Sequence, residues 1–115
     1  MIVLILTLKV SPSDRKDVVS IFDTIAGSTS VKPGCKKVRL YFDVDNGDEL
    51  LLIEEWEALS DLERHVASDE FMKIMAIMDM AVEPPEISFN TVSSIEGFEL
   101  VEKIRKNMNT KKKFF

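Results

Sequence analysis

The chain has little of the residue types that most active sites are built from. Its 115 residues include one cysteine, one histidine and one tryptophan. Cys35 alone cannot form an internal disulfide, so we expect a reducing, cytoplasmic environment. His65 and Cys35 lie far apart without ligand spacing, so no metal site is expected. The sequence also has no glycine-rich phosphate loop and no serine or cysteine nucleophile motif.

Long apolar runs and an excess of positive charge are missing as well. Residues 2–8 are apolar, but the run is too short for a bilayer, has no basic lead-in and meets Lys9, which favours a buried strand over a signal peptide. The net charge is −5, which argues against nucleic acid as a partner. The basic run Lys111-Lys112-Lys113 is either a solvated chain end or a contact for an anionic partner. Neither a membrane nor a nucleic acid is therefore expected as a partner.

What the sequence does contain is an ordinary globular balance, with 45% apolar and 30% charged residues. Apolar alternation and continuous apolar runs predict strands over residues 2–10, 35–44, 49–57 and 86–95. Helical spacing predicts one helix from Ser11-Pro12 to Gly27, and one or two more from Ser60 and Ser68 up to the Pro84-Pro85 pair. Asn46-Gly47 predicts a tight hairpin that joins the second and third strands.

The order β-α-β-β-α-β predicts an α+β, ferredoxin-like protomer with an antiparallel sheet. Residues 1–96 form that domain, and residues 97–115 add a helix over 98–107 and a basic tail. Two helices cover only one face of such a sheet, yet the first and third strands are apolar on both faces. Exposed apolar surface costs about 25 cal/mol per Å², so we expect a homodimer formed through the second sheet face. The alternative is a monomer whose last helix covers that face.

The spacing of four residues around His65 indicates a resemblance to a known family. Trp56-x8-His65-x2-Ser68-x2-Phe71, after a strand and a capped helix, resembles the antibiotic biosynthesis monooxygenase (ABM) domain of the dimeric α/β-barrel superfamily. The resemblance covers roughly residues 1–95. It implies a barrel-forming dimer with a pocket between sheet and helices in each protomer. It also implies, for some members, oxidation of phenols or quinols by molecular oxygen without a bound cofactor.

Other members of that family degrade heme, and the resemblance there is poor. Heme-degrading relatives carry an asparagine on the first strand, a tryptophan on the helix and a histidine one turn after the motif phenylalanine. The matching positions here read Thr7, His65 and Met75. Heme degradation is therefore disfavoured, and no cofactor is expected.

Each candidate site residue has a plain structural alternative. His65 is the one side chain of a type that titrates near neutral pH, and is either a general base or a structural helix residue. Trp56 either stacks on an aromatic substrate or packs the helix. Phe71, Met72 and Met75 either line an adaptable pocket or fill the core. Asn90 either orients a ligand or makes a hydrogen bond at the strand edge.

Two consecutive carboxylates complete the candidates. Glu54 and Glu55 point to opposite faces of their strand, so one of them faces the interior, as half of a buried ion pair with Arg39 or Lys37 or as a general base.

These observations lead to a first hypothesis of a small homodimeric monooxygenase acting on a hydrophobic aromatic such as a quinol. A non-catalytic dimer that binds a small apolar ligand or a protein is the competing class, and a degenerate member with a filled pocket is the third. A cavity reached by the His65 imidazole separates the third hypothesis from the other two.

Overall fold

The computed structural model describes the backbone of residues 1–112 and the side chains of residues 1–109. Eight elements follow one another along the chain: β1 (Ile2–Lys9), α1 (Arg15–Ser30), β2 (Cys35–Phe42), β3 (Glu49–Trp56), α2 (Leu59–Val66), α3 (Asp69–Asp79), β4 (Glu86–Thr91) and α4 (Phe98–Lys112). The basic run Lys111-Lys112-Lys113 lies outside the residues whose side chains are described.

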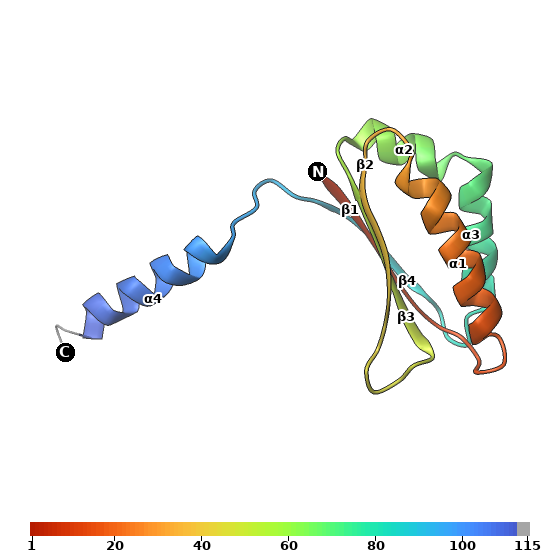
Figure 1. The fold of residues 1–115 in the computed structure, drawn as a ribbon, viewed down its shortest axis with the longest axis horizontal. Helices are drawn as coiled ribbons and strands as arrows, with labels where there is room; N and C mark the ends of the chain where they lie inside the picture. Colours follow the sequence, from red (N-terminus) through yellow and green to blue (C-terminus); the bar gives the residue numbers. More distant parts are fainter. Residues whose placement is uncertain (113–115) are drawn as a thin grey trace.

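The four strands form one antiparallel sheet in the order β2-β3-β1-β4. Helices α1, α2 and α3 cover one of its faces (Figure 1). This is the predicted ferredoxin-like α+β arrangement, with the second helical segment divided into α2 and α3. The helix-covered face is the one that holds the candidate histidine.

Strict alternation along the two central strands builds the core. In β1 and β3 every second residue is buried and its neighbours are half-buried, and Leu4, Leu6 and Leu52 are at most 2% exposed. The apolar stripes of α1 and α3 close over these leucines, with Phe22 and Ile74 at their centres. Buried residues thus recur at every second position on the strands and at about every 3.6 positions on the helices that pack on them.

Two predicted helix starts are wrong in detail. Helix α1 begins at Arg15 after an Asp14 cap residue whose side chain makes no capping hydrogen bond, because it accepts one from the Ser11 hydroxyl instead. Helix α2 begins after Ala58, so Ser60 does not open a capping box. Ser68, in contrast, caps α3 as predicted, since its Oγ accepts a hydrogen bond from the Phe71 N–H.

Helix and strand ends also differ from the prediction. Helix α1 continues through Gly27 to Ser30, since one glycine in a helix costs only about 1 kcal/mol. The loop between β2 and β3 is wider than a tight Asn-Gly turn, and the Asp43 carboxylate holds it by accepting two backbone hydrogen bonds. Among the described residues only Gly34 has positive φ, at 81°, so Gly47 is not the residue that needs it. Strand β4 ends at Thr91 and not at residue 95.

The second sheet face, here called the open face, is bare in the described part of the chain. It carries Val3, Ile5, Leu51 and Ile53, which are half-buried. Helix α4 does not fold over it and projects away from the body on that side (Figure 1). The radius of gyration is therefore 18.4 Å, against about 13 Å for a compact chain of this length. No helix among the described residues is long and apolar enough to cross a membrane.

Candidate functional site

Three aromatic rings meet where β3 ends and the helices begin. Trp56 is the last residue of β3 on the helix-covered face, and His65 lies in the last turn of α2. Their ring centres are 4.7 Å apart with a tilt of 30°. Phe71, from α3, packs edge-on to the imidazole at 5.5 Å. All three are at most 5% exposed, so the predicted trio is assembled around a buried histidine.

A carboxylate lies beneath these rings. Glu54 is fully buried, because alternation along β3 puts it on the same face as Trp56. Its Oε1 accepts a hydrogen bond of 3.1 Å from the indole Nε1 and lies 3.2 Å from His65 Nε2. The imidazole contact has ion-pair distance but poor hydrogen-bond alignment, so His65 Nε2 and Glu54 Oε2 have no hydrogen-bond partner among the described residues. Buried polar atoms of this kind are rare and mark sites with unmet bonding capacity.

The second strand carboxylate, Glu55, is not the interior one, and its ion pair is not the buried pair that was predicted. Glu55 faces the open side and lies 3.7 Å from the Lys37 ammonium. Arg39 is not a partner of either carboxylate; its guanidinium donates to the Val38 carbonyl. The inward carboxylate is therefore Glu54, and its neighbours are Trp56 and His65 rather than a cation.

The other imidazole nitrogen contacts a residue that the sequence did not single out. Lys32 Nζ lies 3.0 Å from His65 Nδ1. An ammonium group can only donate, so Nδ1 accepts and the ring proton is on Nε2, which faces Glu54. The ring is thus held between a cation and a carboxylate, in one tautomer. The Lys32 ammonium therefore occupies the lone pair of His65 Nδ1.

Helix α1 and α3 hold Lys32 in place through Glu70. The ammonium lies 3.4 Å from Glu70 Oε1 and 3.4 Å from the Ser68 hydroxyl. Two α1 hydroxyls donate to the same carboxylate, from Ser28 at 2.7 Å and from Thr29 at 2.6 Å. Burial raises the pKa of Glu70, but these hydrogen bonds and the Lys32 charge outweigh it and leave the pKa below its ordinary value.

A hollow of about 230 Å³ opens beside the imidazole. It is bounded by residues of the α1–β2 loop, the end of β3, α2 and the start of α3: Lys32, Pro33, Trp56, Asp61, Arg64, His65 and Ser68. Lys32 and Arg64 put positive charge at its wall, where each lies near a carboxylate, Glu70 at 3.4 Å and Asp61 at 3.5 Å, and the buried Trp56 adds an apolar edge. The arrangement suits a small, flat molecule with an acidic hydroxyl or a negative charge.

The structure separates the remaining candidates from this hollow. Met72 and Met75 are 65% and 54% exposed on the outer side of α3 and do not line it. Asn90 lies on the open face and donates to the Val3 carbonyl and the Ser88 hydroxyl. Thr7 also belongs to the open face. No sequence pattern singles out Lys32, because its polar loop has the composition of an ordinary connection before the Pro33-Gly34 turn.

Cys35 lies at the edge of the site without joining it. Burial, and then the charge of Glu54, raise the pKa of its thiol. The thiol is therefore kept in its neutral, weakly nucleophilic form.

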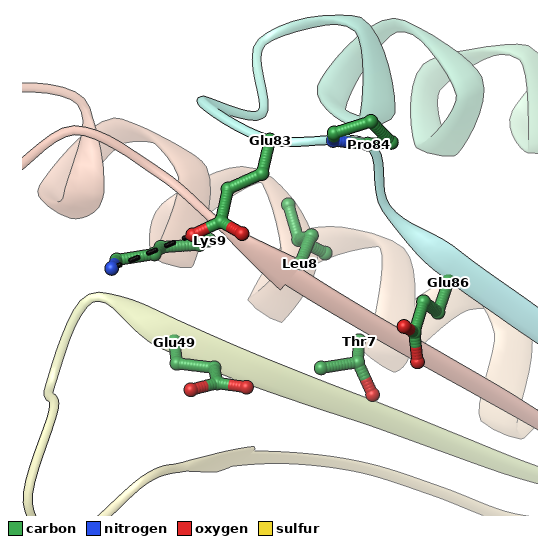
Figure 2. A pocket seen from close by; sticks show the side chains of 7 residues that line it. All are labelled: Thr7, Leu8, Lys9, Glu49, Glu83, Pro84 and Glu86. Atoms are coloured by element: carbon green, nitrogen blue, oxygen red, sulfur yellow. Dashed lines mark ion pairs between the residues drawn. The ribbon is translucent and has the colours of Figure 1, made fainter.

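A separate hollow of about 210 Å³ lies at the far end of the sheet (Figure 2). Glu49, Glu83 and Glu86 surround it, and Lys9 reaches to 3.6 Å from Glu83 Oε1 at its rim. It contains no histidine and no aromatic ring. It therefore lacks the histidine and the tryptophan that line the other hollow.

Comparison with known proteins agrees with this architecture. A candidate antibiotic biosynthesis monooxygenase of Deinococcus radiodurans superposes with a TM-score of 0.78 at 17% identity, covering 84% of this chain and 97% of that one. A Mycobacterium tuberculosis protein superposes with a TM-score of 0.74 at 21% identity, covering 84% and 98%. A conserved protein of Methanosarcina mazei gives a TM-score of 0.71 at 22% identity, covering 77% and 89%. At these identities the likeness shows the fold.

The family follows from the sequence itself. No curated protein matches this chain. The sequence model of the antibiotic biosynthesis monooxygenase family, however, matches residues 1–77, which include β1 to α2, the cap residue Ser68 and most of α3. The chain therefore belongs to the antibiotic biosynthesis monooxygenase family.

Proposed function

We propose that this chain is a monooxygenase for small phenols or quinols that bind in the His65 hollow. The observation that carries the proposal is the buried imidazole held between the Lys32 ammonium and the Glu54 carboxylate at the wall of that hollow. Membership of a monooxygenase family supports the reaction class. The substrate class is inferred from the apolar edge of Trp56 and the positive charge beside it.

The reaction balances without a further reductant. A phenol with a free para C–H reacts with one O₂ to give a quinone and one water. One oxygen atom enters the ring, and the other leaves with the two hydrogens of the substrate. The substrate supplies all four electrons that reduce O₂.

The protein's part in this reaction is to produce and hold the phenolate. Lys32 turns from the imidazole to the phenol oxygen and stabilises its negative charge, which frees His65 Nδ1 to take the proton. The resulting imidazolium is stabilised by Glu54, 3.2 Å from Nε2. Trp56 holds the ring flat against the end of β3. The electron-rich phenolate is the form that O₂ oxidises.

We also propose that the working unit is a homodimer paired through the open face. The half-buried Val3, Ile5, Leu51 and Ile53 make that face apolar, and no described element covers it. Two such faces packed together remove this surface from water and form the barrel of the superfamily. Each protomer keeps its own His65 hollow on the outer, helix-covered side.

Oxygen uptake with a panel of phenols and quinols tests the enzymatic proposal. We expect uptake by the wild type, a loss of about 100-fold or more in His65→Ala, and a comparable loss in Lys32→Met. Asp23→Ala, on the exposed side of α1, is the control and should keep full activity. Equal uptake by wild type and His65→Ala would refute the role given to the imidazole.

The competing proposal is a non-catalytic binder of the same ligands. The Lys32 contact with Nδ1 favours it, because that contact occupies the lone pair that a base would need. Saturable quenching of Trp56 fluorescence by a phenol, together with no oxygen uptake, would support binding without catalysis.

A further inference from the structure

Helix α4 is an amphipathic helix without a partner surface in its own chain. Leu100, Val101, Ile104 and Met108 follow helical spacing and are 37–51% exposed. An isolated helix of this length is marginal in water. We propose that α4 clasps a second copy of this chain, with its apolar stripe seated on the partner's α3 and β4. This inference rests on the homodimer proposed above, and goes beyond it by adding a second contact between the protomers.

The solved relatives indicate that α4 is an addition to the family fold. The Deinococcus and Mycobacterium proteins are covered almost end to end, at 97% and 98%, while 16% of this chain stays unmatched in each superposition. Residues 98–115 make up about that share of the chain. Relatives without this segment can therefore still pair through their open faces, whereas only chains with this segment can form the clasp.

The direction of α4 excludes a contact with its own helices. Helices α1, α2 and α3 lie on one side of the sheet, and α4 projects from the other (Figure 1). A hydrogen bond from Val92 N–H to the Met1 carbonyl fixes the chain up to the end of β4. The described residues beyond that point extend on the open-face side of the sheet, where a partner lies when two open faces meet (Figure 1).

The reach of the segment matches the thickness of a partner. Residues 92–97 span up to about 20 Å, and the 15 residues of α4 add about 22 Å. Two packed sheets lie about 10 Å apart, and the partner's helices lie roughly another 10 Å beyond its sheet. Helix α4 is thus long enough to pass the edge of the partner's sheet and lie against its helical layer.

An apolar surface, called the shelf below, is exposed in that layer. Phe89 and Ile87 pair with Leu4 and Leu6, which places them on the helix-covered face, yet they are 49% and 36% exposed. Helix α3 turns the flank that bears Glu70 towards α1, so Met72 and Met75 belong to the opposite flank, towards edge strand β4. The shelf is Met72, Met75, Ile87 and Phe89. Its methionines are the pocket candidates that the His65 hollow left unused.

Charge supports the same pairing. Asp69 and Asp79 follow the methionine flank of α3 at helical spacing, and both are exposed. Lys103 and Arg105 flank the apolar stripe of α4 on its two sides. The apolar stripe of α4 would thus lie on the apolar shelf of the partner, with its cations beside the carboxylates of α3. The two surfaces are complementary in hydrophobicity and in charge.

Cross-linking of the full chain tests the clasp. In a Cys35→Ser background, Ile104→Cys and Met75→Cys proteins are mixed, equilibrated and treated with a short bismaleimide. We expect covalent dimers in the mixture well above the level of either protein alone. Asp23→Cys on the exposed side of α1 replaces Met75→Cys in the matched control and should give none above background.

A second variant keeps the result independent of cross-linking chemistry. Ile104→Glu places a charge in an exposed helix position, so folding is preserved, and should weaken the dimer at least 10-fold in sedimentation equilibrium. Glu102→Ala, on the polar side of α4, should leave it unchanged. A stable dimer that gives no cross-link and ignores Ile104→Glu would overturn the clasp while leaving the open-face dimer standing. Cross-links within single chains of an Ile104→Cys/Met75→Cys protein would also overturn the clasp alone. A monomer at all concentrations would overturn both.

Discussion

The contact between Glu54 and His65 can be measured as a coupling free energy. Each side chain is almost fully buried, and each presents one polar atom without a hydrogen-bond partner among the described residues. Replacing either one by leucine leaves the other buried without its opposite group. Such a loss costs about 2–4 kcal/mol. The double replacement removes both polar groups from the core, so it should cost less than the two single changes added together.

The double-mutant cycle of Glu54→Leu and His65→Leu should therefore show a coupling of about 1–3 kcal/mol. The indole N–H of Trp56 loses its acceptor in both variants that lack Glu54, so its contribution cancels from the coupling. Urea unfolding followed by Trp56 fluorescence is a direct assay, because this is the only tryptophan and is 1% exposed. With a slope of about 1–2 kcal/mol per molar urea, each single variant should shift the midpoint by about 2 M.

Protein concentration must be equal in all four measurements, since association adds to apparent stability. A coupling below about 0.5 kcal/mol would show that the two groups do not stabilise one another. It would remove the basis for an imidazolium stabilised by Glu54.

Three further outcomes follow from single features of the fold. Burial raises the pKa of Glu70, but its hydrogen bonds have the larger, opposite effect, so the pKa in the folded chain is lower than in the unfolded chain. The ionised carboxylate therefore stabilises the fold above the unfolded pKa of about 4.3. This stabilisation is lost as the pH falls through the lower folded pKa. Glu70→Gln should cost about 1–2 kcal/mol at pH 7 and progressively less in acid, with the exposed Glu63→Gln as control, in urea titrations at several pH values; a pH-independent loss would contradict this. Because burial and a nearby carboxylate raise the pKa of Cys35, iodoacetamide should alkylate it several-fold more slowly at pH 8 than in the unfolded chain, by mass spectrometry. Gly34→Ala should destabilise by about 2–4 kcal/mol, because φ is 81° and the new Cβ would overlap the Asp61 carboxylate, whereas Gly27→Ala should stabilise by about 0.5–1 kcal/mol in the same assay; similar effects at both positions would refute the conformational argument.

The sequence was sufficient for the fold because its strongest signals are periodic and local. Continuous apolar runs predicted the first and third strands over residues 2–10 and 49–57, and Ser68 predicted the start of α3. Element ends were less predictable. Whether Gly27 ends a helix depends on the packing of the turns around it, which local propensity does not contain.

The site was only partly predictable for a related reason. Trp56, His65 and Phe71 belong to a motif within 16 residues, so their proximity follows from one strand and two short helices. Lys32 reaches His65 across 33 positions from a different loop, and no local pattern announces such a contact. The opposite error arose on α3, where Met72 and Met75 had the composition of a pocket wall but the helical phase of an outer flank.

Backbone hydrogen bonds hold the loop before β2 on both sides of Lys32. Its backbone N–H donates to the Thr29 carbonyl, its own carbonyl accepts from Cys35, and Gly34 accepts from Glu57. The main chain is thus held at both sides of the lysine, so the exchange of His65 Nδ1 for a ligand oxygen that we propose requires movement of the side chain alone, which also contacts Glu70 and Ser68. In the reaction that we propose, such a backbone would limit the reorganisation that deprotonation of a phenol requires.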